Sequence, residues 1–358
     1  MRYRRLGRTG LSVSEIGLGA AGLRLSSTEY AVQMVRRALD LGVNYFDTAS
    51  SYGDSEDKLG IALEGRRQEV FLATKLDAAT AEEGEREFAA CLRRLRTDYV
   101  DVLHLHGLTD FEDLDRRTAA GGAWNMLRRA KAEGRARFIG VTAHRHDVLV
   151  GALRRCEIDV VLLIMNLVEL GATKELIPLA QQQDVGITVM KPLAMGLLPP
   201  RLALRFLLSQ PVSCVVPGPS RLEWLQSDLA VSDTPLPLGE DEEAEIERLR
   251  AEYDSTRCRL CFLCQPCPLG VEIGFALGTY RFFHAVQNMG REESLSFPWG
   301  DWARAHAPLE LARVTAGIER CDGCGQCEPR CPYGLPIVRM LKDMLPALRE
   351  VQDMLSTW

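Results

Sequence analysis

The sequence predicts an α/β protein in two parts: an eight-stranded parallel barrel, then a smaller, cysteine-rich and mainly helical domain. Two observations carry this prediction. Short apolar runs alternate with amphipathic stretches over roughly the first 230 residues, and eight of the eleven cysteines lie between Cys258 and Cys331. Regular alternation of strands and helices favours a parallel sheet with crossover helices, and eight such units favour a closed (β/α)8 TIM barrel.

Eight short apolar runs are the candidate strands of the barrel. They cover residues 15–19, 44–47, 70–74, 100–104, 138–141, 160–165, 186–190 and 214–216. The clearest amphipathic stretches between them cover residues 28–41, 85–96, 123–132, 147–155 and 174–182. A doubly wound open sheet would alternate in the same way. However, no GxGxxG motif follows the first strand, which favours the barrel.

A proline-containing linker divides the chain. Residues 1–14 predict a small hairpin that turns at Arg8-Thr9-Gly10, and with the barrel they make a first domain of residues 1–232. The linker segment, residues 233–257, starts with Asp233-Thr-Pro-Leu-Pro-Leu-Gly and continues as an acidic helix from about Glu240 to Tyr253. The cysteine-rich domain then covers residues 258–358.

Composition and charge exclude several classes of protein. The chain is 46% hydrophobic and 26% charged, as expected for a globular protein. Its net charge of −6 does not favour nucleic acid or an anionic membrane as a partner. No segment approaches the ~18 apolar residues of a membrane span, and the basic start lacks the apolar core of an export signal. We therefore expect a cytoplasmic protein, in which clustered cysteines indicate metal binding or catalysis before disulfides.

The second cysteine run has the spacing of bacterial ferredoxins. It reads Cys321-x2-Cys324-x2-Cys327-x3-Cys331, followed by proline. In that spacing three cysteines hold one [4Fe–4S] cluster and the fourth ligates the other cluster of a pair. Glycines after the first two cysteines supply the positive φ angles that such a tight loop needs.

The first run is one residue tighter but also ends in Cys-Pro. It reads Cys258-x2-Cys261-x2-Cys264-x2-Cys267. Two zinc sites or a disulfide mesh are the alternatives, but four-cysteine zinc sites usually separate two CxxC pairs by a longer loop. We predict two [4Fe–4S] clusters with exchanged fourth ligands. Cys331 completes the cluster of the first run, and Cys267 completes the cluster of the second.

Polar side chains follow three consecutive predicted strands of the barrel. Asp47 ends the second and Tyr52 follows it by five residues, Lys75 ends the third, and His106 follows the fourth. Each alone is more often structural, and an Asp–Lys pair is usually only an ion pair. Together, at the carboxy ends where barrel enzymes carry their sites, they predict a proton donor, because a tyrosine hydroxyl (pKa ~10) is a stronger acid beside an ammonium group. His104 faces the same side as His106, as a pocket or a packing residue.

These segments resemble the aldo-keto reductase family, and within it the branch that carries an appended ferredoxin-like domain. In the barrel the resemblance rests on Leu6-Gly-Arg-Thr-Gly-Leu-Ser-Val-Ser-Glu-Ile-Gly-Leu-Gly19, Phe46-Asp-Thr-Ala49, Thr74-Lys75, Tyr99-Val-Asp-Val-Leu-His-Leu-His106 and Met190-Lys-Pro-Leu193. In the tail it rests on Cys267-Pro-Leu-Gly-Val-Glu-Ile273 and Cys331-Pro-Tyr-Gly-Leu-Pro-Ile337. The resemblance covers essentially the whole chain.

The resemblance implies a role for each residue of the tetrad, Asp47, Tyr52, Lys75 and His106. Tyr52 would protonate a carbonyl oxygen as hydride arrives. Lys75, tied to Asp47, would strengthen Tyr52 as an acid, and His106 would orient the substrate. It also implies a nicotinamide cofactor, NADP(H) or NAD(H). Its binding positions would be Thr142, Asn166, Lys191, Gly218, Ser220, Arg221 and Asp228.

The cofactor groove departs from the family pattern. The Ser-Asn and Gln that usually hold the carboxamide are replaced by Thr142-Ala143 and Leu162, and Met190 stands where an aromatic ring usually stacks. The basic residues that grip a 2′-phosphate are missing except for Arg221. Each lost charge-assisted bond is worth about 1.5–3 kcal/mol, so weak discrimination between NADPH and NADH is expected.

Three functions fit these features. The first is an oxidoreductase that interconverts a small carbonyl and its alcohol, with the clusters as an electron relay or docking module for a redox partner protein. The second is an iron–sulfur electron-transfer protein whose barrel does not use nicotinamide. In the third, the clusters are purely structural. Hydride carries two electrons and each cluster takes one, and no flavin motif is present to split the pair.

Overall fold

The computed structural model describes residues 1–194, 196, 198–253, 258–259, 261–278 and 300–356, with only the backbone of 300–308, 310 and 354–356. Two compact units divide the chain, Met1–Glu243 and Ala244–Trp358. The predicted linker and acidic helix at residues 233–257 straddle this division.

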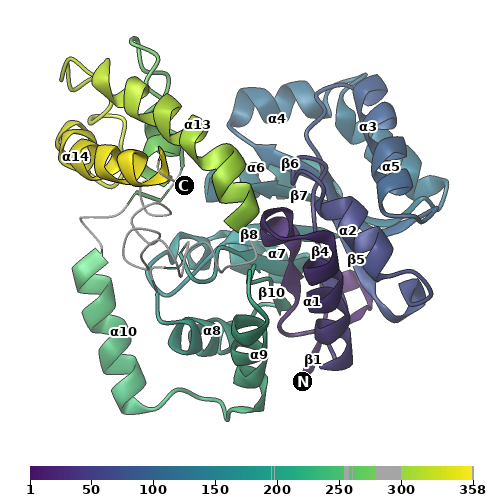
Figure 1. The fold of residues 1–358 in the computed structure, drawn as a ribbon. Coiled ribbons are helices and arrows are strands. Elements are labelled where there is room, and N and C mark those ends of the chain that lie inside the picture. Colours follow the sequence, from purple (N-terminus) through teal and green to yellow (C-terminus); the bar gives the residue numbers. More distant parts are fainter. Residues whose placement is uncertain (195, 197, 254–257, 260, 279–299, 357–358) are drawn as a thin grey trace. The chain divides into compact units, whose positions relative to one another are not determined.

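The first unit is built on eight parallel strands that follow one another in chain order around the sheet (Figure 1). They are β3 (Leu18–Gly19), β4 (Tyr45–Asp47), β5 (Phe71–Leu76), β6 (Val100–Leu108), β7 (Ala136–Ala143), β8 (Val160–Ile164), β9 (Gly186–Met190) and β10 (Cys214–Val215). A parallel bridge between Ile16 and Val215 joins the first strand to the last. Backbone bonds from Gly17 N–H to Val215 O (2.8 Å) and from Val215 N–H to Glu15 O (2.9 Å) reinforce it. The predicted barrel is confirmed.

The predicted hairpin is also present and packs on the barrel interior. Strands β1 (Tyr3–Arg5) and β2 (Ser12–Ser14) pair antiparallel around a short 3-10 turn at Gly7–Thr9. Leu6, Leu11 and Val13 join the buried cluster formed by interior side chains of the barrel strands. Gly7 lies against the first residue of β9, with so little space that a Cβ there would be 2.2 Å from Gly186 N. The hairpin therefore closes the amino-terminal end of the strands.

α-Helices connect the strands and cover them on the outside of the barrel (Figure 1). They are α1 (Thr28–Asp40), α2 (Ser55–Ala62), α3 (Ala81–Arg94), α4 (Phe111–Thr118), α5 (Ala123–Ala132), α6 (His146–Arg155), α7 (Leu176–Gln182), α8 (Pro200–Leu208) and α9 (Leu222–Ala230). Short 3-10 segments lie at Ala20–Leu25, Arg67–Glu69, Gly171–Thr173 and Val231–Asp233. Helix α3 begins four residues earlier than the pattern predicts, because Thr80 and Glu83 form a capping box at its start.

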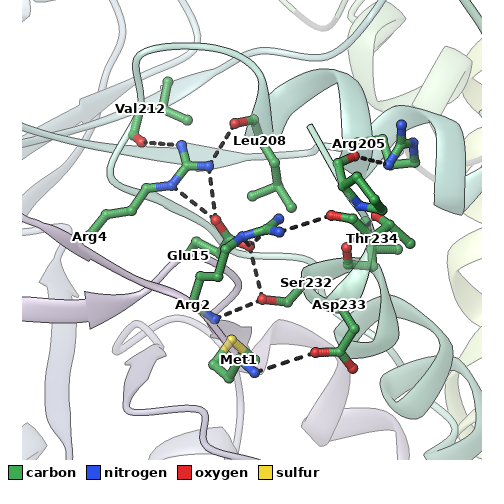
Figure 2. A network of polar contacts seen from close by, with 12 residues as sticks. Met1, Arg2, Arg4, Glu15, Arg205, Leu208, Val212, Ser232, Asp233 and Thr234 are labelled. Carbon is green, nitrogen blue, oxygen red and sulfur yellow. Dashed lines mark hydrogen bonds and ion pairs between the residues drawn. The ribbon is translucent and has the colours of Figure 1, made fainter. Parts of the chain in front are cut away.

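A buried carboxylate ties the hairpin to the end of the first unit (Figure 2). Glu15 is 1% exposed and accepts hydrogen bonds from Arg2 Nε (2.8 Å), Arg4 Nη2 (2.9 Å) and Ser232 Oγ (2.9 Å). Arg4 also donates to the carbonyl oxygens of Leu208 and Val212. One side chain thus holds together segments more than two hundred residues apart in the sequence.

We expect Glu15→Gln to destabilise the protein strongly. The amide cannot neutralise Arg2 and Arg4. Because these two arginines are partly exposed, the loss should fall near the lower end of the about 3–5 kcal/mol typical for a broken buried pair. Urea unfolding of the full chain measures it. Asp233→Asn is the matched control, because Asp233 is exposed, its ion pair with the terminal amine is long at 3.6 Å, and its loss should cost under ~1 kcal/mol. Equal effects of the two substitutions would contradict this role of Glu15.

The second unit is mainly helical. Helix α10 (Glu240–Tyr253) matches the predicted acidic helix and ends within this unit, which also contains α13 (Gly300–Glu319) and α14 (Ile337–Ser356). Leu311 and Ile318 of α13 and Leu341 and Leu348 of α14 are buried, as is Ile273 next to the first cysteine run. Among the described residues, no helix combines the length and hydropathy that a membrane crossing requires.

Candidate functional site

A buried ion pair lies at the carboxy ends of β4 and β5. Lys75 Nζ donates to Asp47 Oδ1 (2.6 Å) and to the carbonyl oxygen of Thr48 (2.6 Å). Lys75 is 1% exposed and Asp47 4% exposed. Burial alone would lower the pKa of Lys75, but Asp47 and the Tyr52 hydroxyl outweigh it and raise that pKa above its ordinary value. The side chain is therefore a permanent ammonium group.

Tyr52 reaches this ammonium group from the loop between β4 and α2. Lys75 Nζ lies 4.9 Å from the centre of the Tyr52 ring, and the Tyr52 hydroxyl is close enough to help raise the pKa of Lys75. The His106 ring stands edge-on to Tyr52, with centroids 5.9 Å apart and planes at 81°. The structure thus brings the four predicted tetrad residues, Asp47, Tyr52, Lys75 and His106, into one group.

Two residues that the sequence analysis missed support this group. Asp77 Oδ1 lies 2.8 Å from His106 Nδ1. Burial would raise the pKa of Asp77, but its contacts with His106 and Ser51 lower it below the ordinary value, so it remains a carboxylate. Arg117, 4% exposed, donates to the carbonyl oxygens of Leu76, Ala78 and His106. Asp77 follows Lys75 by two residues, and that same-face spacing is the one signal that could have found it.

The predicted nucleotide contacts follow the next strands of the barrel. Thr142 Oγ1 accepts from Gly107 N–H (2.9 Å), which links the ends of β6 and β7. Asn166 donates from Nδ2 to Lys191 O (3.2 Å) and accepts at Oδ1 from Val168 N–H (3.2 Å). Lys191 has a φ of +55°, a conformation that is costly for a residue with a side chain and is concentrated at functional sites.

His144 is a further residue at this rim that the sequence analysis did not single out. Its Nε2 lies 2.7 Å from Lys191 Nζ. Burial, then the charges of Lys191 and His106, lower the pKa of His144 to about 3. The imidazole is therefore neutral at physiological pH and accepts a hydrogen bond from the ammonium group of Lys191.

The predicted phosphate contacts gather at the start of α9. Gly218, Ser220 and Arg221 lie between β10 and this helix, and Arg221 occupies the position just before its first residue. Arg221 lies 5.8 Å above the Trp224 ring and 3.8 Å from Glu223. The first backbone N–H of the helix, that of Leu222, donates to the Tyr30 hydroxyl (3.0 Å). A helix start with a neighbouring arginine suits an anionic group.

Asp228, the last predicted nucleotide contact, is a buried side chain of α9. It is 3% exposed, and burial raises its pKa to about 7. Its surroundings therefore penalise a negative charge, and at neutral pH the residue is in part a neutral acid.

Asp228→Asn should stabilise the protein more at alkaline pH than at acid pH. The carboxyl group has a pKa of about 3.8 when unfolded and about 7 when folded. The cost of ionisation is therefore absent below pH ~4, grows between pH 4 and 7, and is complete above pH 7. Three pKa units correspond to about 4 kcal/mol, an upper figure. Urea unfolding should show a gain of a few kcal/mol at pH 8.5 and roughly a third of that gain at pH 5, and a gain of the same size at both values would refute the raised pKa.

Four cysteines of the two runs line one cavity in the second unit. Its walls include Cys267 from the first run and Cys321, Cys324 and Cys327 from the second, with apolar floor residues such as Val338 and Leu341. These are the four residues assigned above to one cluster by exchanged ligation. All eight cysteines of the two runs are free thiols. The residues present therefore fit an iron–sulfur cluster at this cavity.

One contact and one pKa shift concern the first cysteine run. The Arg259 guanidinium lies 4.0 Å from the centre of the Tyr333 ring, so a residue next to Cys258 stacks on one that follows Cys331. Burial, together with the neighbouring Cys258 and Cys261, raises the pKa of Cys264 to about 12. Clustered thiols of this kind ionise only when a cation neutralises them, as iron does.

Comparison with known proteins identifies both parts of the chain. The model of the aldo/keto reductase family matches residues 15–201, and that of a 4Fe-4S dicluster domain matches residues 253–335. L-galactose dehydrogenase of Arabidopsis thaliana is 35% identical over 217 residues, which cover 55% of this chain and 67% of that protein. D-threo-aldose 1-dehydrogenase of a Pseudomonas species is 28% identical over 228 residues, 53% of this chain and 68% of that protein.

Solved structures agree on the fold. The holo form of an aldo-keto reductase from Bacillus halodurans has a TM-score of 0.62 and 27% identity, and covers 70% of this chain and 96% of its own. An aldo/keto reductase from Klebsiella pneumoniae, solved in complex with NADP and acetate, has a TM-score of 0.60 with the same coverage, and its 23% identity bears on the fold alone. The chain belongs to the aldo/keto reductase family and carries a 4Fe-4S dicluster domain after its barrel.

Proposed function

We propose that the barrel interconverts a small carbonyl compound and its alcohol with a nicotinamide nucleotide, and that Tyr52 is the general acid. The observation that carries this proposal is which groups the Lys75 ammonium contacts. It bonds Asp47 and the Thr48 carbonyl, and it lies 4.9 Å from the centre of the Tyr52 ring. An ammonium group has no atom that can accept a proton from the Tyr52 hydroxyl, so that proton is free for a substrate oxygen.

Each residue of the tetrad then has a defined task. Tyr52 gives its proton to the carbonyl oxygen, and the phenolate that remains is stabilised by the charge of Lys75. Asp47 keeps Lys75 charged and aimed at Tyr52. His106, held by Asp77 at Nδ1, uses Nε2 to orient the carbonyl group. The nucleotide, when bound, supplies the hydride, and the residues that would hold it are Thr142, Asn166, Lys191, Gly218, Ser220 and Arg221.

The names of two relatives suggest which substrates to test first. L-galactose and D-threo-aldoses are sugars, and the relatives that carry these names are dehydrogenases. Sugars and simple polyhydroxy aldehydes are therefore the first compounds to test as the carbonyl–alcohol pair. The reaction would run as an oxidation or a reduction according to the cofactor supplied.

We infer that residues 258–358 hold two [4Fe–4S] clusters. Cys258, Cys261, Cys264 and Cys331 would ligate the first, and Cys267, Cys321, Cys324 and Cys327 the second. The shared cavity supports the second set, and the stacking of Arg259 on Tyr333 supports the first. Cys324 is exposed whereas Cys264 and Cys327 are buried, so the second cluster would offer its edge to a redox partner protein.

Arg221→Ala should weaken NADPH binding more than NADH binding. Arg221 is the one basic side chain among the proposed phosphate contacts, so its loss removes a charge-assisted bond of about 1.5–3 kcal/mol to the 2′-phosphate, or about 10- to 100-fold in affinity. Fluorescence titration of the full chain with each nucleotide measures the ratio, with Arg201→Ala on α8 as the control. Equal losses for both nucleotides would show that Arg221 does not contact the 2′-phosphate. No binding of either nucleotide would favour the electron-transfer alternative.

A further inference from the structure

Buried polar atoms without hydrogen-bond partners gather inside the barrel. Within the part of the chain that the structure describes, they include the Tyr45 hydroxyl, Asp47 Oδ2 and both ring nitrogens of His104. Tyr45 and Val102 belong to the interior core, and Asp47 and His104 each follow one of them by two residues on the same strand. Because side chains alternate along a strand, all three polar groups face the interior.

Buried polar atoms of this kind are expected to bind a hydrogen-bond partner. A buried donor or acceptor left unsatisfied costs about 1–3 kcal/mol, and folded proteins contain few of them. Lys75 is not that partner, because its hydrogen bonds go to Asp47 Oδ1 and to Thr48 O, and none reaches Asp47 Oδ2. The His104 ring lies near the Val141 carbonyl and the Tyr45 hydroxyl near Thr188, so Asp47 Oδ2 and one ring nitrogen of His104 are the atoms that most need a partner from outside the protein chain.

His104 stands beside Lys75 and has a space made for it. Lys75 and His104 are register partners on β5 and β6, and Lys75 also bonds Asp47 at the end of β4, so the three side chains come from neighbouring strands. His104 is completely buried. Its ring fills the place opposite Gly140 on β7, where a Cβ would lie 2.4 Å from Nδ1. The barrel thus accommodates a polar ring in its interior.

The ring of His104 is uncharged. Burial lowers its pKa well below the ordinary value, and the nearby charges of Lys75 and His106 lower it further. A neutral imidazole has one N–H donor and one lone pair. It can therefore share a water molecule with a carboxylate without adding a second positive charge beside Lys75.

We propose that the barrel encloses an ordered water between Asp47 Oδ2 and His104, and that His104 is a positioning residue that holds the Asp47 carboxylate through this water. A buried water typically makes about three hydrogen bonds to otherwise unsatisfied groups, and the Tyr45 hydroxyl is the third candidate. With Oδ1 bound to Lys75 and Oδ2 bound to the water, the carboxylate cannot rotate, and Lys75 stays aimed at Tyr52. The functional part of this inference rests on the proposed role of the tetrad.

Two variants of His104 separate positioning from packing. His104→Leu fills the space but cannot bind water, whereas His104→Gln keeps a donor and an acceptor. Leu105→Val is the control, because Leu105 is equally buried but faces the opposite side of β6. The assay is the reduction of 4-nitrobenzaldehyde by NADPH. We expect kcat of the leucine variant to fall about tenfold and KM to stay within twofold. A loss of about tenfold is the lower end of what is seen when a residue that supports a metal ligand is removed. The glutamine variant should recover most of kcat, and Leu105→Val should keep all of it.

A high-resolution crystal structure of the wild-type chain tests the water directly. We expect density for a water within hydrogen-bond distance of Asp47 Oδ2 and a ring nitrogen of His104, and its loss in His104→Leu. An interior without this water would overturn the inference. His104 would be only a packing residue if the leucine and glutamine variants lost the same fraction of kcat and the same amount of thermal midpoint. If Tyr52→Phe remained active while the water was present, the proposed function would fail and the water site would stand.

Discussion

Tyr52→Phe should reduce carbonyl turnover by about 10²- to 10⁴-fold, the range that general acid catalysis contributes. The substitution removes only the hydroxyl that lies beside Lys75 and, in the proposed mechanism, donates to the substrate. Lys75 keeps its bonds to Asp47 and Thr48, so the ion pair and the fold should survive. Steady-state assays with NADPH and an active aldehyde measure the loss, and KM should change little because the ring remains.

Two controls make this result specific. The content of iron and sulfide should equal that of the wild-type protein, since Tyr52 lies in the barrel unit and all the proposed ligands lie in the other. Tyr99→Phe removes an exposed hydroxyl that bonds Gln68, away from the proposed site, and should leave kcat unchanged. A Tyr52→Phe variant with near-normal turnover on its true substrate would show that the tetrad no longer acts as a proton donor.

Cys267→Ser should destroy the cluster that the second run holds, although Cys267 belongs to the first. The cavity shared by Cys267, Cys321, Cys324 and Cys327 is the reason. Anaerobically reconstituted wild-type protein should carry eight iron and eight sulfide per chain, as two [4Fe–4S] clusters require. The variant should lose about half of both.

Spectroscopy of paired variants identifies which cluster is lost. The electron paramagnetic resonance signal that remains in Cys267→Ser should match the one that remains in Cys321→Ser, and should differ from the one in Cys258→Ser. Cys156→Ser is the control, since this half-buried cysteine lies at the end of α6, and it should retain both clusters. If Cys267→Ser matched Cys258→Ser instead, each run would hold its own cluster.

The barrel was predictable because its elements obey simple periodicities. Helix α5 and strand β9 begin and end where the pattern predicts, and alternation along β6 places His104 and His106 on one side. Helix α2 was missed because its buried side carries Ser55, Glu56 and Lys58, which pair with polar groups of other elements. Strand β6 runs four residues beyond its apolar stretch, with a register shift between Leu105 and Leu108. Such features depend on tertiary partners and leave no local pattern.

Some residues of the candidate site could be predicted from the sequence and others could not. The tetrad could be predicted because its residues end consecutive strands, whose carboxy ends meet at one rim. Asp77 and Arg117 act through contacts with other elements of the barrel, and the burial of Asp228 depends on which side of α9 packs inward. One sequence does not contain that information, since the same residues would be ordinary surface charges on another fold.

Transfer of deuterium from nucleotide to substrate tests the central proposal most directly. Anaerobically purified protein is mixed with NADPH deuterated at both C4 positions and with a panel of sugars and simple aldehydes, and the alcohols are analysed by mass spectrometry. We expect one deuterium on the former carbonyl carbon, in the absence of any added electron carrier, and none with Tyr52→Phe. Unlabelled alcohol would contradict hydride transfer on the barrel. So would the absence of any alcohol, if the reduced clusters of the same protein still pass electrons to an acceptor.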